Sequence, residues 1–470
     1  MIPDNFSAPF VFRPGPSKSK SLFRSLLRRW KALKAGSRDD EVCLPLEPLG
    51  FWPGRSSALI CENGAPASPL DGYAFHTRYV PSTGGRISFR VKLVGLVGTR
   101  GKLLISINGI NQNGQPLMPK IEKFDLDQLA RGRREIEVST VALFENSYAV
   151  TGTLIGSDAQ VASIEVTVTG ADSDDAYIAR LEAAQRGFLS APGQGSLADI
   201  VVNRKATLLS PVSQMCTASQ MREPIYDEIC AEMGEAPKLH RKQWEFAYII
   251  RALTHHGALR KGARGLGFGV GVEPLSSIFA RAGCDIVATD LPADDDRASV
   301  WHDTAQLSTN LRQIFHERLC DEQQFFGHVI FRPVDMNAIP NSLSGFDFTW
   351  SSCAYEHLGS IEAGLAFFEN SLNCLAPGGL AVHTTEINLS SNDGTLDRGS
   401  TVIFRRRDFE QLAARLISLG HEVFPITFDT GQEDLDRIID LPPYSNDPHL
   451  KLALMRWVST SFGMIVRKAR

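Results

Sequence analysis

The sequence lacks the features by which several classes of protein are recognised. Its eight cysteines are scattered and form no C-x-x-C pair, so a zinc ribbon or a dithiol redox motif is not expected. The formal net charge is only -4, which gives no general reason to expect a nucleic-acid partner. No apolar run is long enough to span a bilayer, and no basic segment followed by a long apolar core marks a secretory signal. These absences favour a cytoplasmic protein with reduced cysteines, and no residue is assigned to a metal.

The composition changes along the chain, which is long enough for two or three domains. Of its 470 residues, 43% are hydrophobic and 22% are charged, as is ordinary for a globular protein. We expect a basic tail with an amphipathic helix (1–50), a β-sandwich-like accessory domain (51–170) and a linker with one helical stretch (171–214). A doubly wound, Rossmann-like α/β domain is expected to fill the remainder (215–470).

The basic tail contains a helical pattern over residues 18–34. Its apolar side chains fall on one face and its lysines and arginines cover the rest, with no acid between Lys18 and Arg38. This pattern is typical of a helix lying on an anionic membrane surface, so we expect a peripheral membrane contact here. The alternatives are a helix docked on its own protein and a solvated basic tail.

Short runs of alternating or β-branched residues characterise the second segment. They occur at 86–94, 102–107, 135–138 and 162–169, with glycine-containing turns between them. Such spacing is typical of an all-β sandwich, which would bind a carbohydrate or mediate contacts. The segment holds no cluster of catalytic side chains, and fold alone does not assign a function.

A glycine-rich run at 264–273 is the most informative part of the chain. Gly267, Gly269 and Gly271 precede an apolar helical segment and a strand-like segment that ends at Asp290. Glycines allow the backbone to approach a ligand where a Cβ would collide. An acid about 19 residues after Gly271 stands where a ribose requires a carboxylate. The run therefore predicts a cofactor that contains a nucleoside.

Further strands and helices alternate beyond this run, which predicts a mostly parallel sheet. A strand-like run at 329–334 is followed by Asp335 and Met336, and one at 346–353 is followed by Glu356 and His357. A helical pattern at 361–375 then stops at a Pro-Gly-Gly turn, 377–379, before a strand at 380–386.

This order resembles the class I S-adenosylmethionine-dependent methyltransferases, and the resemblance covers roughly residues 241–468. It implies that S-adenosyl-L-methionine is the cofactor. The three glycines would lie under its methionine and ribose parts, and Asp290 would bind the ribose hydroxyls. The remaining implied contacts are to the adenine, from Leu291, Asp335 and Met336, and to the neighbourhood of the transferable methyl group, from Ser351 to His357.

One position departs from the family pattern. The family places an acid two residues before the first glycine of the loop, where this chain has Gly265. Glu273, directly after the loop, is the candidate replacement in contacting the amino group of the methionine part.

Candidate catalytic residues follow the fourth and fifth strands, because ligands bind outside the carboxyl ends of strands in open α/β sheets. His357 and Glu356 are candidates for the base, since an imidazole titrates near neutrality. The alternative is that both residues only pack or cap the next helix. Glu386 ends the fifth strand and would hydrogen-bond an acceptor, although it also suits an ordinary loop start. Arg241, Trp244 and Glu245 lie one helical turn apart and either cover the cofactor or pack on the sheet.

The predicted function is therefore S-adenosylmethionine-dependent methyl transfer. The C-terminal part, including the Thr-Thr-Glu strand segment (384–386) and the Arg-Arg-Arg-Asp helix start (405–408), resembles bacterial methyltransferases that accompany glycosyltransferases. This resemblance implies O-methylation of a sugar or glycan-type acceptor, and the net charge favours no nucleic-acid partner. A dehydrogenase would leave Asp335 and the Pro-Gly-Gly turn unexplained. The alternative is a non-catalytic carbohydrate-binding or scaffold protein with a degenerate methyltransferase fold.

Overall fold

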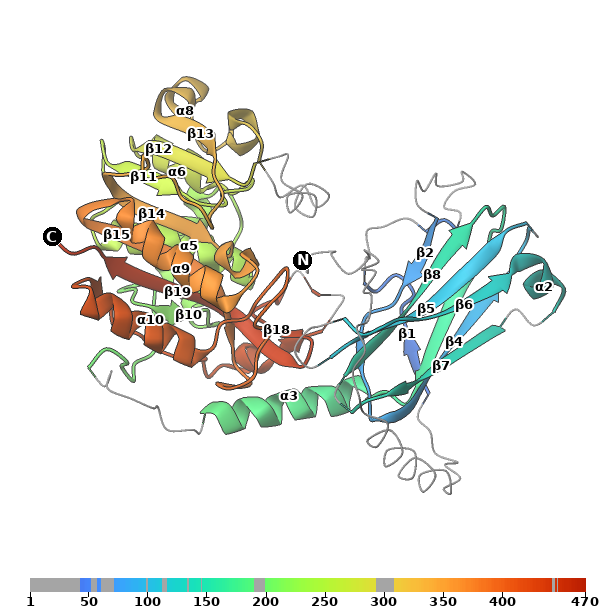
Figure 1. Cartoon of the computed structure of the whole chain (residues 1–470). Coiled ribbons are helices and arrows are strands. Elements are labelled where there is room, and N and C mark those ends of the chain that lie inside the picture. Colours follow the sequence, from blue (N-terminus) through green and yellow to red (C-terminus); the bar gives the residue numbers. More distant parts are fainter. Residues whose placement is uncertain are drawn as a thin grey trace, which may run out of the picture. The chain divides into compact units, whose positions relative to one another are not determined.

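The chain divides into a β-rich unit and a C-terminal α/β unit (Figure 1). The computed structural model describes residues 43–51, 57–60, 72–98, 100–111, 116–132, 135–144, 146–189, 199–292, 308–441, 444–445 and 447–470. The predicted basic helix at 18–34 lies outside these residues. Within them, no helix has both the length and the apolar character needed to cross a membrane.

The β-rich unit ends at Ser173 and holds two antiparallel sheets, as expected from the alternating runs. One sheet has the order β1-β9-β4-β7, and the other has the order β2-β8-β5-β6 with β3 paired to β8. Apolar side chains of β4 such as Phe89 and Val91 are fully buried, whereas Arg90 and Lys92 between them are exposed. The elements are β1 (Leu44–Leu46), β2 (Tyr73–His76), β3 (Val80–Pro81), β4 (Gly85–Val94), β5 (Lys102–Ile110), β6 (Lys120–Asp125), α2 (Leu126–Arg131), β7 (Glu135–Ala142), β8 (Ser147–Ile155) and β9 (Ser163–Thr169).

The C-terminal unit is built on one sheet whose path runs β13-β12-β11-β14-β15-β19-β18-β17. The first five strands are parallel, and β19 runs antiparallel to β15, so the sheet is mostly parallel as predicted. Short strands β10 and β16 also pair with β19. The strands are β10 (Gln214–Met215), β11 (Arg264–Gly267), β12 (Asp285–Asp290), β13 (Val329–Pro333), β14 (Phe346–Ser352), β15 (Leu375–Asn388), β16 (Glu422–Val423), β17 (Ile439–Asp440), β18 (Lys451–Leu454) and β19 (Trp457–Arg467).

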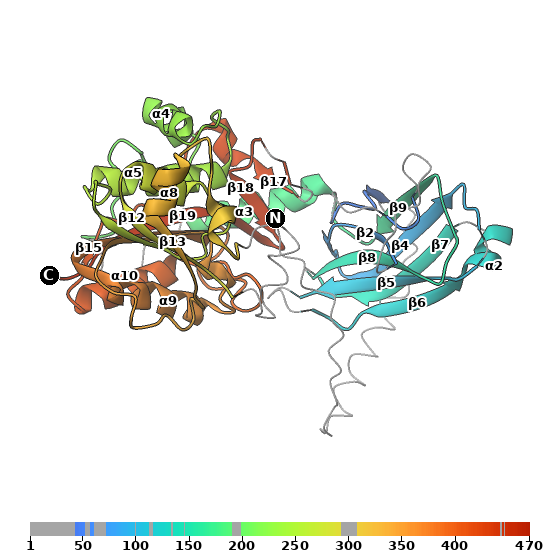
Figure 2. The same cartoon turned by 90° about the horizontal axis from the view of Figure 1, so that it is seen from above.

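Helices cover both faces of this sheet (Figure 2). Side chains alternate between the two faces along each strand, so they contribute to two separate apolar cores. Val382 belongs to the core under α4, α5, α6 and α8. Its neighbour Ala381 belongs to the core under α3, α9 and α10. The helices are α3 (Asp174–Leu189), η1 (Gln220–Arg222), α4 (Pro224–Glu232), α5 (Arg241–His255), α6 (Leu275–Arg281), η3 (Leu311–Ile314), α8 (Glu322–His328), η4 (Tyr355–His357), α9 (Ile361–Asn373), α10 (Arg406–Ser418) and η5 (Asp434–Arg437).

Two details differ from the sequence-based expectation. Residues 199–214 were expected to belong to a linker, but Leu208 and Ser213 are fully buried in the C-terminal unit and Ser213 Oγ accepts from the Ile465 amide. The Pro-Gly-Gly turn does not precede the fifth strand but lies within the bounds of β15, where pairing with β14 slips between Phe346 and Phe348. Gly378 supplies the positive φ, 79°, of this bulge.

Packing explains why Gly265 stands where the methyltransferase family has an acid. A Cβ on Gly265 would lie 2.4 Å from Cζ of Phe348 and 2.8 Å from Cδ1 of Ile286. Both neighbours are buried in the core under α5 and α6. A side chain at this point of β11 would therefore collide with the core.

We predict that Gly265→Ala lowers the free energy of unfolding by about 1–3 kcal/mol, because an extra methyl group in a packed core forces its neighbours to move. Urea unfolding monitored by circular dichroism measures this. The control is Gly327→Ala in α8, where a Cβ has nothing within 4 Å. At this position alanine should raise the free energy of unfolding by about 0.5–1 kcal/mol. Equal stability of Gly265→Ala and the parent would contradict the packing argument.

Candidate active site

The carboxyl ends of β11, β12, β14 and β15 meet at one edge of the sheet, and the glycine-rich loop lies there. The Phe268 amide donates to the Trp350 carbonyl (2.9 Å) and the Val270 amide donates to the Thr289 carbonyl (3.0 Å), so β14 and β12 fix the loop from both sides. Gly269 and Gly271 have φ of 57° and 49°, a conformation that favours glycine.

The same loop brings two distant segments together. A Cβ on Gly269 would lie 2.8 Å from the Ala354 Cβ and 3.4 Å from the Met336 Sδ. The loop after β11, the turn after β13 and the turn after β14 therefore enclose one place. The sequence predicts this place as the cofactor site, and the missing Cβ keeps the loop backbone close to whatever lies there.

Asp290 ties the loop to β12. Its carboxylate accepts hydrogen bonds from the backbone amides of Gly271 (3.0 Å), Leu291 (2.8 Å) and Ser308 (3.1 Å). Burial raises the pKa of Asp290, and these three donors oppose that shift. The carboxylate is thus held at the end of β12 beside Gly271, the position at which the sequence places a ribose ligand.

Glu273 is buried beneath the loop. Its Oε1 accepts a hydrogen bond from the indole Nε1 of Trp350 at 2.6 Å. Burial raises the pKa of Glu273 to about 8, although the Trp350 hydrogen bond and the nearby Lys242 lower it. The pKa shift therefore favours the neutral carboxylic acid near pH 7.

The other predicted cofactor residues have mixed surroundings. Asp335 is half-buried and its Oδ1 accepts from the Asn337 amide at 2.8 Å, while Leu291 is half-buried at the end of β12. Ser351 is fully buried and its hydroxyl lies 2.8 Å from Nδ1 of His383. The Ser351 side chain therefore points into the core under α9, so only its backbone lies along the predicted site.

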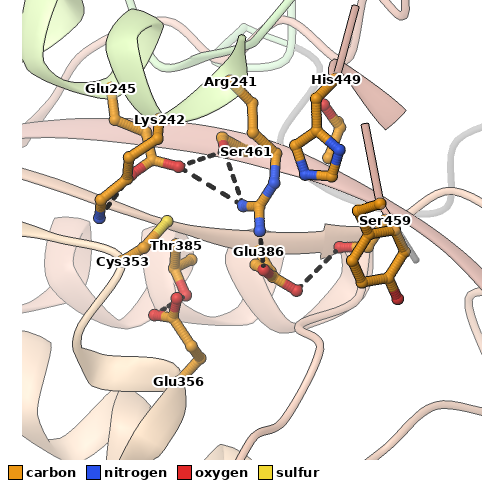
Figure 3. Close-up of polar contacts among 12 residues, drawn as sticks. Arg241, Lys242, Glu245, Cys353, Glu356, Thr385, Glu386, His449, Ser459 and Ser461 are labelled. Carbon is orange, nitrogen blue, oxygen red and sulfur yellow. Dashed lines mark hydrogen bonds and ion pairs between the residues drawn. The ribbon is translucent and has the colours of Figure 1, made fainter. Parts of the chain in front are cut away.

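The first turn of α5 brings three charged side chains to the same edge (Figure 3). Glu245 is fully buried, and its Oε2 lies 3.0 Å from Nζ of Lys242 and accepts from the Ser352 hydroxyl at 3.1 Å. Lys242 also donates to the Ser352 carbonyl at 3.0 Å. Burial opposes ionisation of Glu245, but the charges of Lys242 and Arg241 outweigh it and lower its pKa to about 2.

Arg241 extends the ion pairs from α5 to β15. Its Nη2 lies 2.6 Å from Oε1 of Glu386, and its Nη1 donates to the Ser461 hydroxyl at 3.2 Å. Ser459 completes the shell of Glu386 by donating to Oε2 at 3.3 Å. Burial lowers the pKa of Arg241, but the carboxylates of Glu386 and Glu245 more than compensate, so the net shift is upward.

Glu356 and His357 lie in η4, directly after β14. Glu356 is 1% exposed, and its Oε2 accepts from the Thr385 hydroxyl at 2.8 Å. Burial and then the Glu386 charge raise the pKa of Glu356 to about 8. His357 Nε2 is 3.8 Å from Glu356 Oε1, and its Nδ1 lies 2.9 Å from the Ser400 carbonyl. Burial lowers the pKa of His357 to about 4.

Cys353 lies near Glu245 and Glu356 and has a strained backbone conformation. It follows β14 with φ of 45°, which is rare for a residue with a side chain. Its amide donates to the Thr384 carbonyl (3.0 Å), which holds the backbone in place. Burial raises the pKa of the Cys353 thiol, and Glu245 and Glu356 raise it further. Strain of this kind is found at functional sites, and here it turns the chain toward η4.

The residues at the start of α5 are only partly those that the sequence pattern indicates. Arg241 and Glu245 were considered as a cover for the cofactor and do reach the sheet edge. Trp244, considered with them, is fully buried instead: it stacks on Tyr248 with ring centroids 5.0 Å apart and donates to Gln220 Oε1. Lys242 was missed, although its i, i+3 spacing to Glu245 was a usable signal.

The chain matches no protein-family model, and the search of curated proteins found no match. It is similar to several solved structures of methyltransferases. One is a magnesium protoporphyrin IX methyltransferase from Synechocystis PCC 6803 (11% identity, 63% of this chain and 97% of that chain, TM-score 0.30). Another is a 1,6-didemethyltoxoflavin-N1-methyltransferase from Burkholderia thailandensis (14%, 49% and 79%, TM-score 0.29). A third is a SAM-dependent methyltransferase from Corynebacterium glutamicum (16%, 53% and 100%, TM-score 0.28).

We predict that Glu245→Gln lowers the free energy of unfolding at pH 7 by about 3 kcal/mol, because it leaves the Lys242 charge at a buried site without a carboxylate. A carboxyl group with a lowered folded-state pKa stabilises above its unfolded pKa, and this contribution is lost as the pH falls from 4.5 toward about 2. The difference between the two proteins should therefore shrink on acidification, as measured by urea unfolding at several pH values.

The matched control is Asp434→Asn, which breaks an exposed i, i+3 pair with Arg437. Because both groups are solvated, this change should cost less than about 1 kcal/mol at any pH. A Glu245→Gln protein as stable as the control would show that the α5 ion pairs do not hold the site together.

Proposed function

We propose that this protein is an S-adenosylmethionine-dependent methyltransferase that methylates a hydroxyl group of a sugar or glycan. The observation that carries the proposal is the convergence of the glycine-rich loop, Asp290 and Met336 at one edge of a mostly parallel sheet. That edge is where open α/β sheets bind ligands. The buried carboxyl of Glu356 beside it supplies a group able to take a proton.

The residues at the edge suit the parts of the cofactor. Gly267, Gly269 and Gly271 leave room along the loop for the ribose and methionine parts, and Asp290 offers carboxylate lone pairs to the ribose hydroxyls. Asp335, Met336 and Leu291 are the candidates for the adenine. When bound, the cofactor supplies a methyl group on a positively charged sulfur, so the protein has only to align the acceptor and remove its proton.

The methionine part has a different set of candidates from the family pattern. Gly265 carries no acid, and Glu273 replaces it beneath the loop, beside Lys242. A cofactor ammonium group near Glu273 would favour the ionised form of this carboxyl. Glu273 therefore binds the amino group of the methionine part in this proposal.

The base is the second element of the proposal, and Glu356 is the best candidate. A base works best when its pKa lies near the working pH, and burial raises the pKa of Glu356 to about 8. Glu386 is less suitable because Arg241 holds it at 2.6 Å. His357 directs Nδ1 to the Ser400 carbonyl, and its pKa of about 4 makes it a weaker proton acceptor. Glu386 and His357 then help to position the acceptor and Glu356.

We predict that calorimetric titration with S-adenosylhomocysteine shows binding and that Asp290→Ala weakens it at least about tenfold, since a charged hydrogen bond contributes about 1.5–3 kcal/mol. The same variant should lose a similar factor for 5′-methylthioadenosine, which has the ribose and lacks the amino-acid part. Glu273→Gln should weaken only S-adenosylhomocysteine.

The control for this titration is Asp285→Asn, at the opposite end of β12, where the carboxylate meets His328 on the surface. Its affinities should match those of the parent. Absence of binding to the parent protein would remove the proposed enzyme and favour a binding or scaffold protein. If Glu273→Gln weakened the binding of both ligands equally, another residue would have to contact the amino-acid part of the cofactor.

We predict that Glu356→Gln lowers methyl transfer at least about a hundredfold without changing cofactor affinity, because the amide cannot take a proton. Only the ionised carboxylate can act, so turnover of the parent should rise with a midpoint near pH 8 and level off at higher pH. Tritium transfer from the labelled cofactor to methyl glycosides, followed from about pH 4 to about pH 10, measures both effects. A rise centred near pH 4 to 5, or an active Glu356→Gln protein, would return Glu356 to a structural role.

A further inference from the structure

A buried imidazole–carboxylate pair lies beside the candidate site and plays no part in the function proposed above. His449 Nδ1 is 2.6 Å from Asp440 Oδ2, and the two side chains are only 8% and 12% exposed. A carboxylate only accepts hydrogen bonds, so Nδ1 carries a proton, and in the neutral imidazole Nε2 then keeps its lone pair. No sequence pattern indicates this pair, whose members belong to β17 and to the loop before β18.

The second nitrogen of this imidazole has no assigned role. Among the described residues, none forms a hydrogen bond with His449 Nε2. The ring is bordered by His240 (centroids 4.9 Å apart) and Tyr444 (5.4 Å), and the Tyr444 hydroxyl donates elsewhere, to the Ala453 carbonyl. Nε2 is not among the fully buried atoms without a partner, so this nitrogen is accessible. An imidazole held in place at one nitrogen and accessible at the other can receive a hydrogen bond from a ligand.

Backbone hydrogen bonds fix His449 at the amino end of α5. Its amide donates to the Leu239 carbonyl at 2.7 Å, and its carbonyl accepts from the Arg241 amide at 2.9 Å. Figure 3 draws the His449 ring next to the Arg241 side chain and above Ser459. Arg241 in turn reaches Glu386, so His449 and Glu356 flank the Arg241–Glu386 ion pair.

The separation of these groups suits an acceptor with more than one hydroxyl. Glu356 follows β14, Glu386 ends β15, and Ser459 belongs to β19, the next strand of the sheet. Neighbouring strands are about 4.8 Å apart, so this row spans about 10 Å. One hydroxyl at Glu356 and a second near His449 would be bound together only if the acceptor extends along this row.

The charges of the row select against anions. Lys242 is paired with Glu245, and Arg241 is paired with Glu386. The groups left to meet an acceptor are His449 Nε2, the carboxyl of Glu356 and Arg241 Nε, a buried donor without a hydrogen-bond partner among the described residues. An uncharged acceptor with several hydroxyl groups can both donate to and accept from these atoms, whereas a carboxylate or phosphate would bring a further negative charge beside Glu386 and Asp440.

We propose that His449, oriented by Asp440, forms a binding subsite for an uncharged polyol and accepts a hydrogen bond from a second hydroxyl of the methyl acceptor. The inference rests on the proposed function. In the reaction, the carbon–sulfur bond of the cofactor breaks with its electron pair going to sulfur, the hydroxyl oxygen of the acceptor bonds to the methyl carbon, and the hydroxyl proton passes to Glu356. His449 binds a different hydroxyl and exchanges no proton.

The experiment measures tritium transfer from labelled cofactor to the methyl α-glycosides of glucose, galactose, mannose and rhamnose, and to the methyl glycosides of glucuronic and galacturonic acid. The parent protein should label at least one neutral glycoside and neither uronic acid. His449→Phe keeps a ring and removes the lone pair, and it should raise KM about tenfold or more with kcat within about threefold. Asp440→Asn should act in the same direction, because it no longer fixes the Nδ1–H tautomer.

His449→Gln, which can present an acceptor oxygen to the same hydroxyl, should recover part of the loss. His328→Asn is the matched control, since it breaks a surface His–Asp pair of 2.8 Å with Asp285, far along the sheet. S-adenosylhomocysteine affinity within twofold of the parent shows that each variant is folded.

Three results would overturn the inference. A fall in kcat at unchanged KM would make His449 a base and not a subsite. Labelling of the uronic acids, or of no neutral glycoside by a protein that binds S-adenosylhomocysteine, would exclude the uncharged polyol. A parent protein that binds no cofactor would remove the proposed function and this subsite with it.

Discussion

The buried carboxylate of Glu245 is the group on which the arrangement of the candidate site depends. It receives the charges of Lys242 and Arg241 and the hydroxyls of Ser352 and Ser461. A charge in a protein interior is tolerated only when it is paired and hydrogen-bonded. One side chain of α5 therefore binds that helix to the ends of β14 and β19, and Arg241 extends the connection to β15 through Glu386.

The same pairing decides the protonation of the carboxyl groups that remain. Glu245 and Glu386 each have a cation within hydrogen-bonding distance, whereas Glu356 has the Thr385 hydroxyl and Glu273 has the Trp350 indole. Without a cation in hydrogen-bonding contact, burial raises the pKa of both Glu356 and Glu273 to about 8. Two neutral acids beside two complete ion pairs add little net charge to this part of the sheet edge.

The predictable parts of the fold are those encoded by local patterns. Alternation along β4 and the succession of strands and helices from β11 onward gave the two kinds of domain, because side-chain periodicity reflects which face is buried. The bulge at Gly378 and the packing of residues 199–214 were not predictable, since both depend on pairing with β14 and β19. Ser351 illustrates the limit for the site: its position on the fourth strand was predicted, but its hydroxyl points to His383, on the other face.

The sequence by itself determined the order of the glycine-rich loop and of the acids that follow successive strands, because each is a short segment with its own conformational requirement. Tertiary structure decided which charged groups meet. Arg241 and Glu386 are separated by 145 residues, and His449 is bound by its backbone to Leu239. The energy of a buried charge depends on partners brought by such distant segments, so the surroundings of Glu356 and the His449–Asp440 pair exist only in the folded chain.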